Sequence, residues 1–387
     1  MRTSTDRILA THVGSLPRPQ GVVDALFAQD RGETVDPVAF YATMRTAVFD
    51  AVRKQVAAGL DVVSDGETSK ISTATYIRHR ITGFEIGESP RQIPSDIDDF
   101  PGFKARLAKI GDTPRYHRPI CRGPIAVKDL APLRKDIAHL KAAMAAAGAT
   151  EGFMNAASPG VIAVFQPNEH YPTQEQYLEA LAQAMRTEYE TIVGAGLVLQ
   201  VDAPDLAMGR HLAFRDKSEA EFLRSARLQV EALNLALVNV PADRVRLHLC
   251  WGNYEGPHHH DIPLERIIDL VLAVNAQALL FEGANPRHAH EWTVWQAARV
   301  PDDRILVPGV IDSVSNFIEH PGLVAEHICR YAEIVGRNRV IAGTDCGFGT
   351  FAGAGAVHPP IAYAKLAALA EGAAMATQRL WRGASTS

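Results

Sequence analysis

The stretch YETIVGAGLVLQVDAPD, residues 189–205, contains the pattern that predicts the fold. A helical segment ends at a glycine, and a short apolar run then leads into acidic and turn residues. The same order occurs in AVRKQVAAGLDVVSDGE, residues 51–67. Four further apolar runs of strand length lie in RVRLHLCWGN (244–253), LVLAVNAQALLFEGAN (270–285), DRILVPGVIDS (303–313) and RNRVIAGTDCG (337–347). Strands that alternate with helices in this way predict a parallel sheet.

Each predicted strand ends in residues that can carry chemistry. They are Glu67, Asp202, His248 with Cys250, Glu282, Asp312, and Asp345 with Cys346. In a (β/α)8 barrel the carboxyl ends of all strands meet on one face, where such enzymes place their sites. A doubly wound open sheet is the alternative, but it normally gathers a ligand at one switch point. We therefore predict an α/β protein with a (β/α)8 TIM barrel.

The length and composition fit one large domain. The chain has 387 residues and 47% hydrophobic content, enough for one barrel with insertions or for two domains. No linker or low-complexity tract divides it, so we expect one catalytic domain over residues 1–387. Residues 85–125 are rich in proline, glycine and charge and have weak periodicity. We interpret them as an irregular insertion with a hairpin of its own, of the kind that often forms a lid or binding loop.

Several protein classes are disfavoured. The formal net charge is −5, and without a long run of like charges we expect no nucleic-acid partner. No window is apolar enough for a membrane span or a signal peptide, so we expect a cytoplasmic protein. Four cysteines are too few and too scattered for a disulfide scaffold. Cys121 and Cys329 are expected to be small buried hydrophobes.

The remaining cysteines are candidate metal ligands. His248 and Cys250 lie two residues apart at a strand end, so their side chains project from the same face. Glu282 closes the next predicted strand, where an apolar run makes a solvated surface role difficult to explain. Cys346 closes a later strand. Imidazole, carboxylate and two thiolates are a ligand set that suits Zn²⁺.

A run of three histidines suggests a second metal hypothesis. His258, His259 and His260 lie in GPHHHDIPL, residues 256–264, a loop with glycine and proline. Adjacent side chains do not easily all face one ion. We therefore expect these histidines to be exposed or to support the main site.

Seven motifs run in order along nearly the whole chain. They are THVGSLPRP (11–19), DVVSDGE (61–67), LQVDAPDL (199–206), HLCWGNYEG (248–256), LLFEGAN (279–285), PGVIDS (308–313) and GTDCGFGT (343–350). In these motifs the chain resembles the cobalamin-independent methionine synthase superfamily, and corresponds to the catalytic C-terminal barrel of its long members. The resemblance implies a zinc (β/α)8 barrel, related to that of uroporphyrinogen decarboxylase. It places the zinc ligands on His248, Cys250, Glu282 and Cys346.

The same resemblance implies a binding site for an amino acid. Val13, Gly14 and Ser15 match the segment whose backbone and hydroxyl hold the substrate. Glu67 and Asp202 match the carboxylates that receive its ammonium group, and paired acidic groups at strand ends suit a cation. Asp202 also fits a cap or turn residue before a proline.

Two departures from the family concern the methyl donor. The folate-stacking tryptophan is expected before residue 160, but GFMNAASPGVIAVF (152–165) contains none. The proton-donating histidine is expected two positions after Asp312, where Val314 stands. Both losses disfavour a folate donor. Short relatives with such changes include epoxyalkane:coenzyme M transferases and methionine synthases that use other donors.

We predict a zinc-dependent thiol alkyltransferase that methylates homocysteine to methionine with a donor other than folate. Zinc favours the thiolate form of a substrate thiol, which can attack an electrophilic carbon. Asp345 is a candidate hydrogen-bond acceptor beside Cys346, and His12 or the three adjacent histidines are candidates to protonate a leaving group. The expected partners are a small-molecule thiol and an alkyl donor, with a homo-oligomer left open.

Three other functions remain as alternatives. The first is opening of an epoxide by coenzyme M. Glu67 and Asp202 would repel its sulfonate unless Arg18 or Lys70 compensated, which favours homocysteine. The second is a zinc- or thiol-binding protein without catalysis, in which the two carboxylates would have no role. The third is a metal-free decarboxylase, which would not need the histidine and cysteines.

Overall fold

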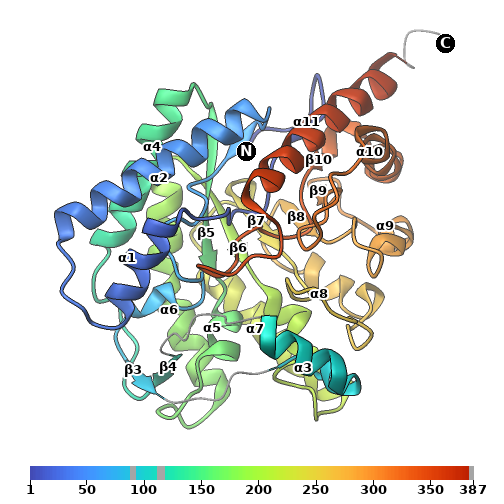
Figure 1. The fold of residues 1–387 in the computed structure, drawn as a ribbon. Coiled ribbons are helices and arrows are strands. Elements are labelled where there is room, and N and C mark those ends of the chain that lie inside the picture. Colours follow the sequence, from blue (N-terminus) through green and yellow to red (C-terminus); the bar gives the residue numbers. More distant parts are fainter. Residues whose placement is uncertain (88–92, 111–117, 383–387) are drawn as a thin grey trace.

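The computed structural model describes residues 1–87, 93–110 and 118–382 and shows strands enclosed by helices (Figure 1). Six parallel strands form one curved sheet in the order β2-β5-β6-β7-β8-β9. Their bounds are β2 (Val62–Val63), β5 (Glu151–Ala157), β6 (Val198–Asp202), β7 (Val245–His248), β8 (Ala278–Phe281) and β9 (Ile305–Pro308). Strands β7, β8 and β9 are buried throughout, which explains the continuous apolar sequences of β8 and β9.

Two short strands complete the barrel. They are β1 (Leu9–Ala10) and β10 (Ile341–Ala342), which pair in parallel. On one side, β10 continues the sheet from β9 through a parallel bridge between Gly309 and Gly343. On the other side, the Asp61 amide donates to the Ala10 carbonyl at 2.9 Å and joins β1 to the start of β2. These eight strands therefore form the predicted (β/α)8 barrel. The alternative prediction of a doubly wound open sheet is wrong.

Helices surround the strands and bury a continuous apolar core against them. Their bounds are α1 (Gln20–Asp30), α2 (Pro37–Ala57), α4 (Ala131–Ala147), α5 (Pro159–Phe165), α6 (Gln174–Gly194), α7 (Glu219–Ala236), α8 (Ile268–Leu272), α9 (Trp292–Ala297), α10 (Pro321–Val335) and α11 (Pro359–Arg382). Local sequence sets several helix starts: at α7, Ser218 and Glu221 form a reciprocal capping box. Within the described ranges, no helix is both long and apolar enough to cross a membrane.

The predicted insertion contains a hairpin, a turn and a helix. Strands β3 (Phe84–Gly87) and β4 (Arg118–Cys121) pair antiparallel, as expected. Between them in the sequence lie the 3-10 turn η2 (Ser95–Asp99) and the helix α3 (Pro101–Ile110), and α3 is seen in the lower part of the view in Figure 1. The periodicity of the region is weak because three kinds of short element follow one another. Residues 88–92 and 111–117 of the insertion lie outside the described residues.

Candidate metal and substrate site

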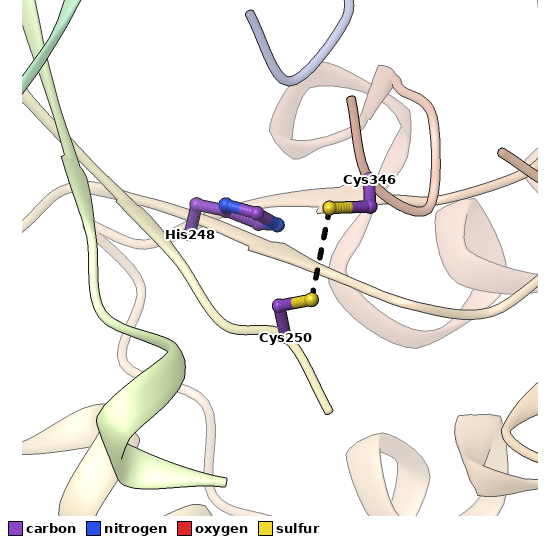
Figure 2. Close-up of side chains that lie close together, drawn as sticks. All are labelled: His248, Cys250 and Cys346. Atoms are coloured by element: carbon purple, nitrogen blue, oxygen red, sulfur yellow. Dashed lines mark hydrogen bonds between the residues drawn. The ribbon is translucent and has the colours of Figure 1, made fainter. Parts of the chain in front are cut away.

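Three of the four expected metal ligands converge at the carboxyl ends of the strands. His248 ends β7, Cys250 follows it by two residues, and Cys346 lies in the loop after β10. All three are buried, and their ligand atoms lie within 4.8 Å of one another. Figure 2 shows the imidazole and the two sulfurs facing a common point. The Sγ atoms are 3.6 Å apart, and both cysteines are free thiols.

This arrangement fits a zinc ion. Zn–S bonds of about 2.3 Å in a tetrahedron place two sulfurs about 3.8 Å apart, close to the observed separation. His248 Nδ1 is 3.0 Å from Asp202 Oδ1, while its buried Nε2 has no hydrogen-bond partner among the described residues. Ligating histidines commonly bond a carboxylate through the ring nitrogen that does not bind metal. The histidine is therefore oriented for a ligand on its Nε2 side.

The pKa values in the cluster of His248, Cys250 and Cys346, called the thiol cluster below, also favour a cation. The hydrogen bond with the Cys346 thiol, and burial, raise the pKa of the Cys250 thiol well above its ordinary value. Burial lowers the pKa of His248, but the Asp202 carboxylate and the nearby Cys250 sulfur outweigh this effect and raise it to about 10. Binding of a metal ion to His248 and Cys250 would therefore displace protons.

The fourth expected ligand, Glu282, lies outside the close group of three. Its Oε1 accepts from the Trp251 amide at 2.8 Å, and its Oε2 accepts from Asn285 Nδ2 at 2.8 Å. Glu282 and Cys346 nevertheless line the same cavity of about 430 Å³. The carboxylate is thus close to the cluster, but both of its oxygens are hydrogen-bonded to the chain.

Asp345 anchors the loop that carries Glu282. Its Oδ1 accepts from the amides of Gly283 and Ala284, and its Oδ2 accepts from the amide of Asn285, each at 2.8 Å. Asn285 Nδ2 also donates to it at 3.0 Å and so connects Asp345 with Glu282. Burial and the Glu282 charge raise the pKa of Asp345 to about 7, against these N–H donors. The contacts give Asp345 a positioning role.

The segment expected to hold an amino acid passes beside the cluster. The Val13 carbonyl accepts from Asn155 Nδ2 at 3.0 Å and from Gln200. Gly14 has φ = 140°, and a Cβ there would lie 2.6 Å from Asn155 Nδ2, so only glycine fits. Ser15 accepts from the Phe348 amide at 2.9 Å, which ties the segment to the loop that follows Cys346.

His12 holds this segment from inside the barrel. Its Nδ1 accepts from the Gly14 amide at 3.2 Å, so its Nε2 carries the proton and donates to Gln55 Oε1 at 2.8 Å. Burial lowers the pKa of His12 to about 3. The ring is therefore neutral near pH 7 with both nitrogens engaged, which favours a positioning role over the predicted proton donation.

The two expected ammonium-binding carboxylates are both largely buried. Burial raises the pKa of Glu67 and the Asp202 charge raises it further, against Lys70. Glu67 has a positive φ of 53°, and Thr73 donates to its carboxylate. Asp202 accepts from Asn155, from Gln200 and from His248 Nδ1. It therefore connects the segment of Val13, Gly14 and Ser15 with the cluster of His248, Cys250 and Cys346 instead of only capping a turn.

Two amides in the barrel interior were not predicted as site residues. Asn155 in β5 and Gln200 in β6 each bridge the Val13 carbonyl and the Asp202 carboxylate. Both interrupt apolar strand sequences, and a buried polar side chain must find partners. A polar residue within an apolar strand sequence is therefore the signal that could have identified Asn155 and Gln200 as site residues.

The three adjacent histidines separate into two groups. His258 lines the cavity, stacks on Tyr254 with ring centroids 4.0 Å apart, and bonds Asp261 at 2.9 Å. His259 and His260 are exposed and contact Asp99 instead. The expectation of exposed and supporting roles is consistent with this arrangement.

The fold and the site define a (β/α)8-barrel protein that gathers an imidazole, two thiols and four carboxylates at its strand ends, those of Glu67, Asp202, Glu282 and Asp345. Residues 8–365 match the family described as cobalamin-independent synthase, catalytic domain. The chain therefore belongs to this family, which is one of methyl-transferring enzymes.

Individual relatives agree with this membership. A methionine synthase of Saccharolobus islandicus is 24% identical over 375 residues, which cover 96% of each chain. A methionine synthase of Sulfolobus acidocaldarius is 24% identical over 340 residues, covering 87% of this chain and 84% of the relative. A solved B12-independent methionine synthase of Shewanella sp. W3-18-1 shares the fold with a TM-score of 0.72 and 18% identity, covering 97% of this chain and 99% of the other.

Proposed function

We propose that this chain methylates homocysteine with a zinc ion held by His248, Cys250, Cys346 and Glu282. The observation that carries the proposal is the buried pair of thiols 3.6 Å apart, facing a histidine whose Nδ1 is held by Asp202. Glu282 would need to exchange one of its two hydrogen bonds for the metal. When bound, zinc would favour the thiolate form of the substrate sulfur.

The carboxylates beside the cluster support an amino-acid thiol. Glu67 and Asp202 are close enough for the charge of one to raise the pKa of the other, and a substrate ammonium would relieve this repulsion. Asp202 also bonds His248, so the ammonium and the sulfur of one small molecule would be positioned by neighbouring groups. The Shewanella relative was solved in complex with selenomethionine, which is an α-amino acid like homocysteine.

The cavity supports a donor other than folate. It measures about 430 Å³, and the loops after β7, β8 and β9 line it. Val314 lies in its wall, at the position where the resemblance places a proton-donating histidine. No tryptophan occurs in residues 152–165. We propose that a different methylated compound enters here.

The contacts of two basic residues weigh against a sulfonate thiol. Arg18 donates to the Glu67 carbonyl from Nε at 3.1 Å and from Nη2 at 2.8 Å. Lys70 Nζ donates to the Asn155 carbonyl at 2.7 Å. Since these donors are directed at the main chain, they favour homocysteine over coenzyme M.

The test is methionine formation by the zinc-loaded chain. The chain is incubated with homocysteine or coenzyme M and with a panel of methyl donors and epoxides, and products are identified by mass spectrometry. Methionine from homocysteine and a non-folate donor, lost in Cys346→Ser, supports the proposal. Alkylation of coenzyme M alone would establish the epoxide-opening alternative, and zinc binding without turnover of any pair would favour the non-catalytic one.

A further inference from the structure

A second convergence of possible metal ligands lies on the surface, outside the thiol cluster. Asp99 comes from η2 in the insertion, while His259 and His260 come from the loop after β7. Both histidine Nε2 atoms approach the same Asp99 oxygen, at 2.9 Å and 3.0 Å. The three ligand atoms lie within 4.8 Å of one another. Two imidazoles and a carboxylate thus face one point across the contact between the insertion and the barrel.

The spacing is close to that of a metal centre. Bonds of about 2.0–2.2 Å in a tetrahedron place neighbouring nitrogen and oxygen ligands about 3.3–3.6 Å apart. The observed separations are smaller by a few tenths of an ångström. All three side chains are partly exposed, with 38% of each imidazole and 50% of the carboxylate accessible, so a small outward shift can admit an ion.

The surroundings hold both imidazoles with Nε2 toward the carboxylate. His260 Nδ1 lies 2.9 Å from the Ser95 hydroxyl, which leaves Nε2 as the ligand atom and provides the outer hydrogen bond that ligating histidines commonly make. The His259 ring packs edge-on against Phe100, with ring centroids 5.6 Å apart. Ser95 is itself fixed, because its amide donates to the His211 carbonyl at 3.1 Å.

Two adjacent carboxylates, those of Asp98 and Asp99, have different partners. Asp98 forms ion pairs with Lys104 and Arg215. Within the described part of the chain, Asp99 has no lysine or arginine ion pair, and its partners are the two imidazoles. Among the described residues, Asp99 is therefore free of the lysine and arginine pairs that would compete with a divalent cation.

We propose that Asp99, His259 and His260 form a second site for a divalent transition metal such as Zn²⁺, with water in the remaining positions. The site shares no residue with the thiol cluster. It joins the insertion to the loop that forms part of the cavity wall, because Asp96 of η2 accepts from the Tyr254 hydroxyl at 2.8 Å and from the His258 amide at 2.7 Å. Metal binding would therefore fasten the insertion to this wall.

The test counts zinc by elemental mass spectrometry after chelator treatment and reloading of the full chain at neutral pH. The wild type should bind two equivalents and His259→Ala/His260→Ala one, because only the exposed site is lost. Asp99→Asn should weaken the second equivalent. His290→Ala, which removes an exposed imidazole outside the cluster, is the matched control and should retain both.

A second readout tests whether the ion fastens the insertion. Zinc should slow trypsin cleavage after Lys104 and Arg106 in the wild type and in Cys250→Ser, but not in His259→Ala/His260→Ala. A wild type that binds one equivalent, with zinc content unchanged in His259→Ala/His260→Ala, would overturn the site. Equal cleavage with and without zinc would overturn its fastening role. Neither result bears on the proposed methyl transfer, because the thiol cluster is separate.

Discussion

Replacing Asp202 with asparagine should weaken both zinc binding and homocysteine binding while leaving the barrel folded. Asp202 Oδ1 accepts from His248 and Gln200, and its Oδ2 accepts from Asn155. If the side-chain oxygen of the new asparagine takes the Oδ1 position, the NH₂ group of that asparagine faces the NH₂ group of Asn155. At least one buried donor then loses its acceptor, at a cost of about 1–3 kcal/mol.

The expected effect on zinc affinity follows from the contact with His248. Removing the partner of a ligating histidine typically lowers metal affinity about 10- to 100-fold. This factor corresponds to about 1.4–2.8 kcal/mol. Loss of the negative charge should also remove one charge-assisted bond to the homocysteine ammonium, worth about 1.5–3 kcal/mol. The KM for homocysteine should therefore rise about tenfold or more.

The assay is competition for zinc with a chromogenic chelator, combined with KM measurements at saturating zinc. Asp205→Asn is the matched control. Asp205 is a buried carboxylate just beyond the same strand, and it accepts from Ser158 Oγ at 2.7 Å. If Asp202→Asn binds zinc and homocysteine as tightly as Asp205→Asn does, the proposed double role of Asp202 is wrong.

Three further predictions concern the cluster and the segment beside it. Cys250→Ser and Cys346→Ser should each release most of the zinc from the buried site, because each removes a thiolate ligand. Full zinc retention at that site, measured with His259 and His260 replaced by alanine, would exclude the ligand set. Gly14→Ala should lower the free energy of unfolding, measured in urea, by more than about 1 kcal/mol, because the new Cβ would meet the Asn155 side chain and the φ of Gly14 is one that L-residues rarely adopt. A decrease below about 0.5 kcal/mol would contradict this packing. Because the pKa of His12 is lowered to about 3 in the folded state, the unfolded state binds more protons below about pH 6.5, and stability should fall by up to about 1.4 kcal/mol per pH unit from there toward pH 3. His12→Gln should reduce that slope by the same amount, and an unchanged slope in urea titrations would show that the ring is not buried neutral.

The strands and their functional ends could be predicted because each unit repeats a local pattern. The order of helix, glycine, apolar strand and acidic turn is visible around Asp202, and it predicts where a parallel strand must end. Of the two closing strands, β10 lies within the run predicted at residues 337–347, whereas β1 contains only two residues, too few for a periodic signal. Barrel closure was therefore an inference from the number of strand ends and not from β1.

Contacts between distant segments could not be predicted. His259 and Asp99 are 160 residues apart, and they meet only because η2 docks on the loop after β7. The hydrogen bonds of Glu282 with Trp251 and Asn285 likewise depend on how two neighbouring loops pack. The residue types at the site followed from sequence, but the orientation of each side chain required the structure.

The central claim is that a buried zinc site presents its ion to an amino-acid thiol, and X-ray absorption at the zinc edge tests it most directly. The measurement uses His259→Ala/His260→Ala, so that only the buried site contributes to the spectrum. Before substrate is added, the spectrum should show two sulfur neighbours, from Cys250 and Cys346. With homocysteine the count should rise to three, while coenzyme M at the same concentration should leave it at two. A count that stays at two with homocysteine, or zinc with no sulfur neighbours at all, would contradict the account.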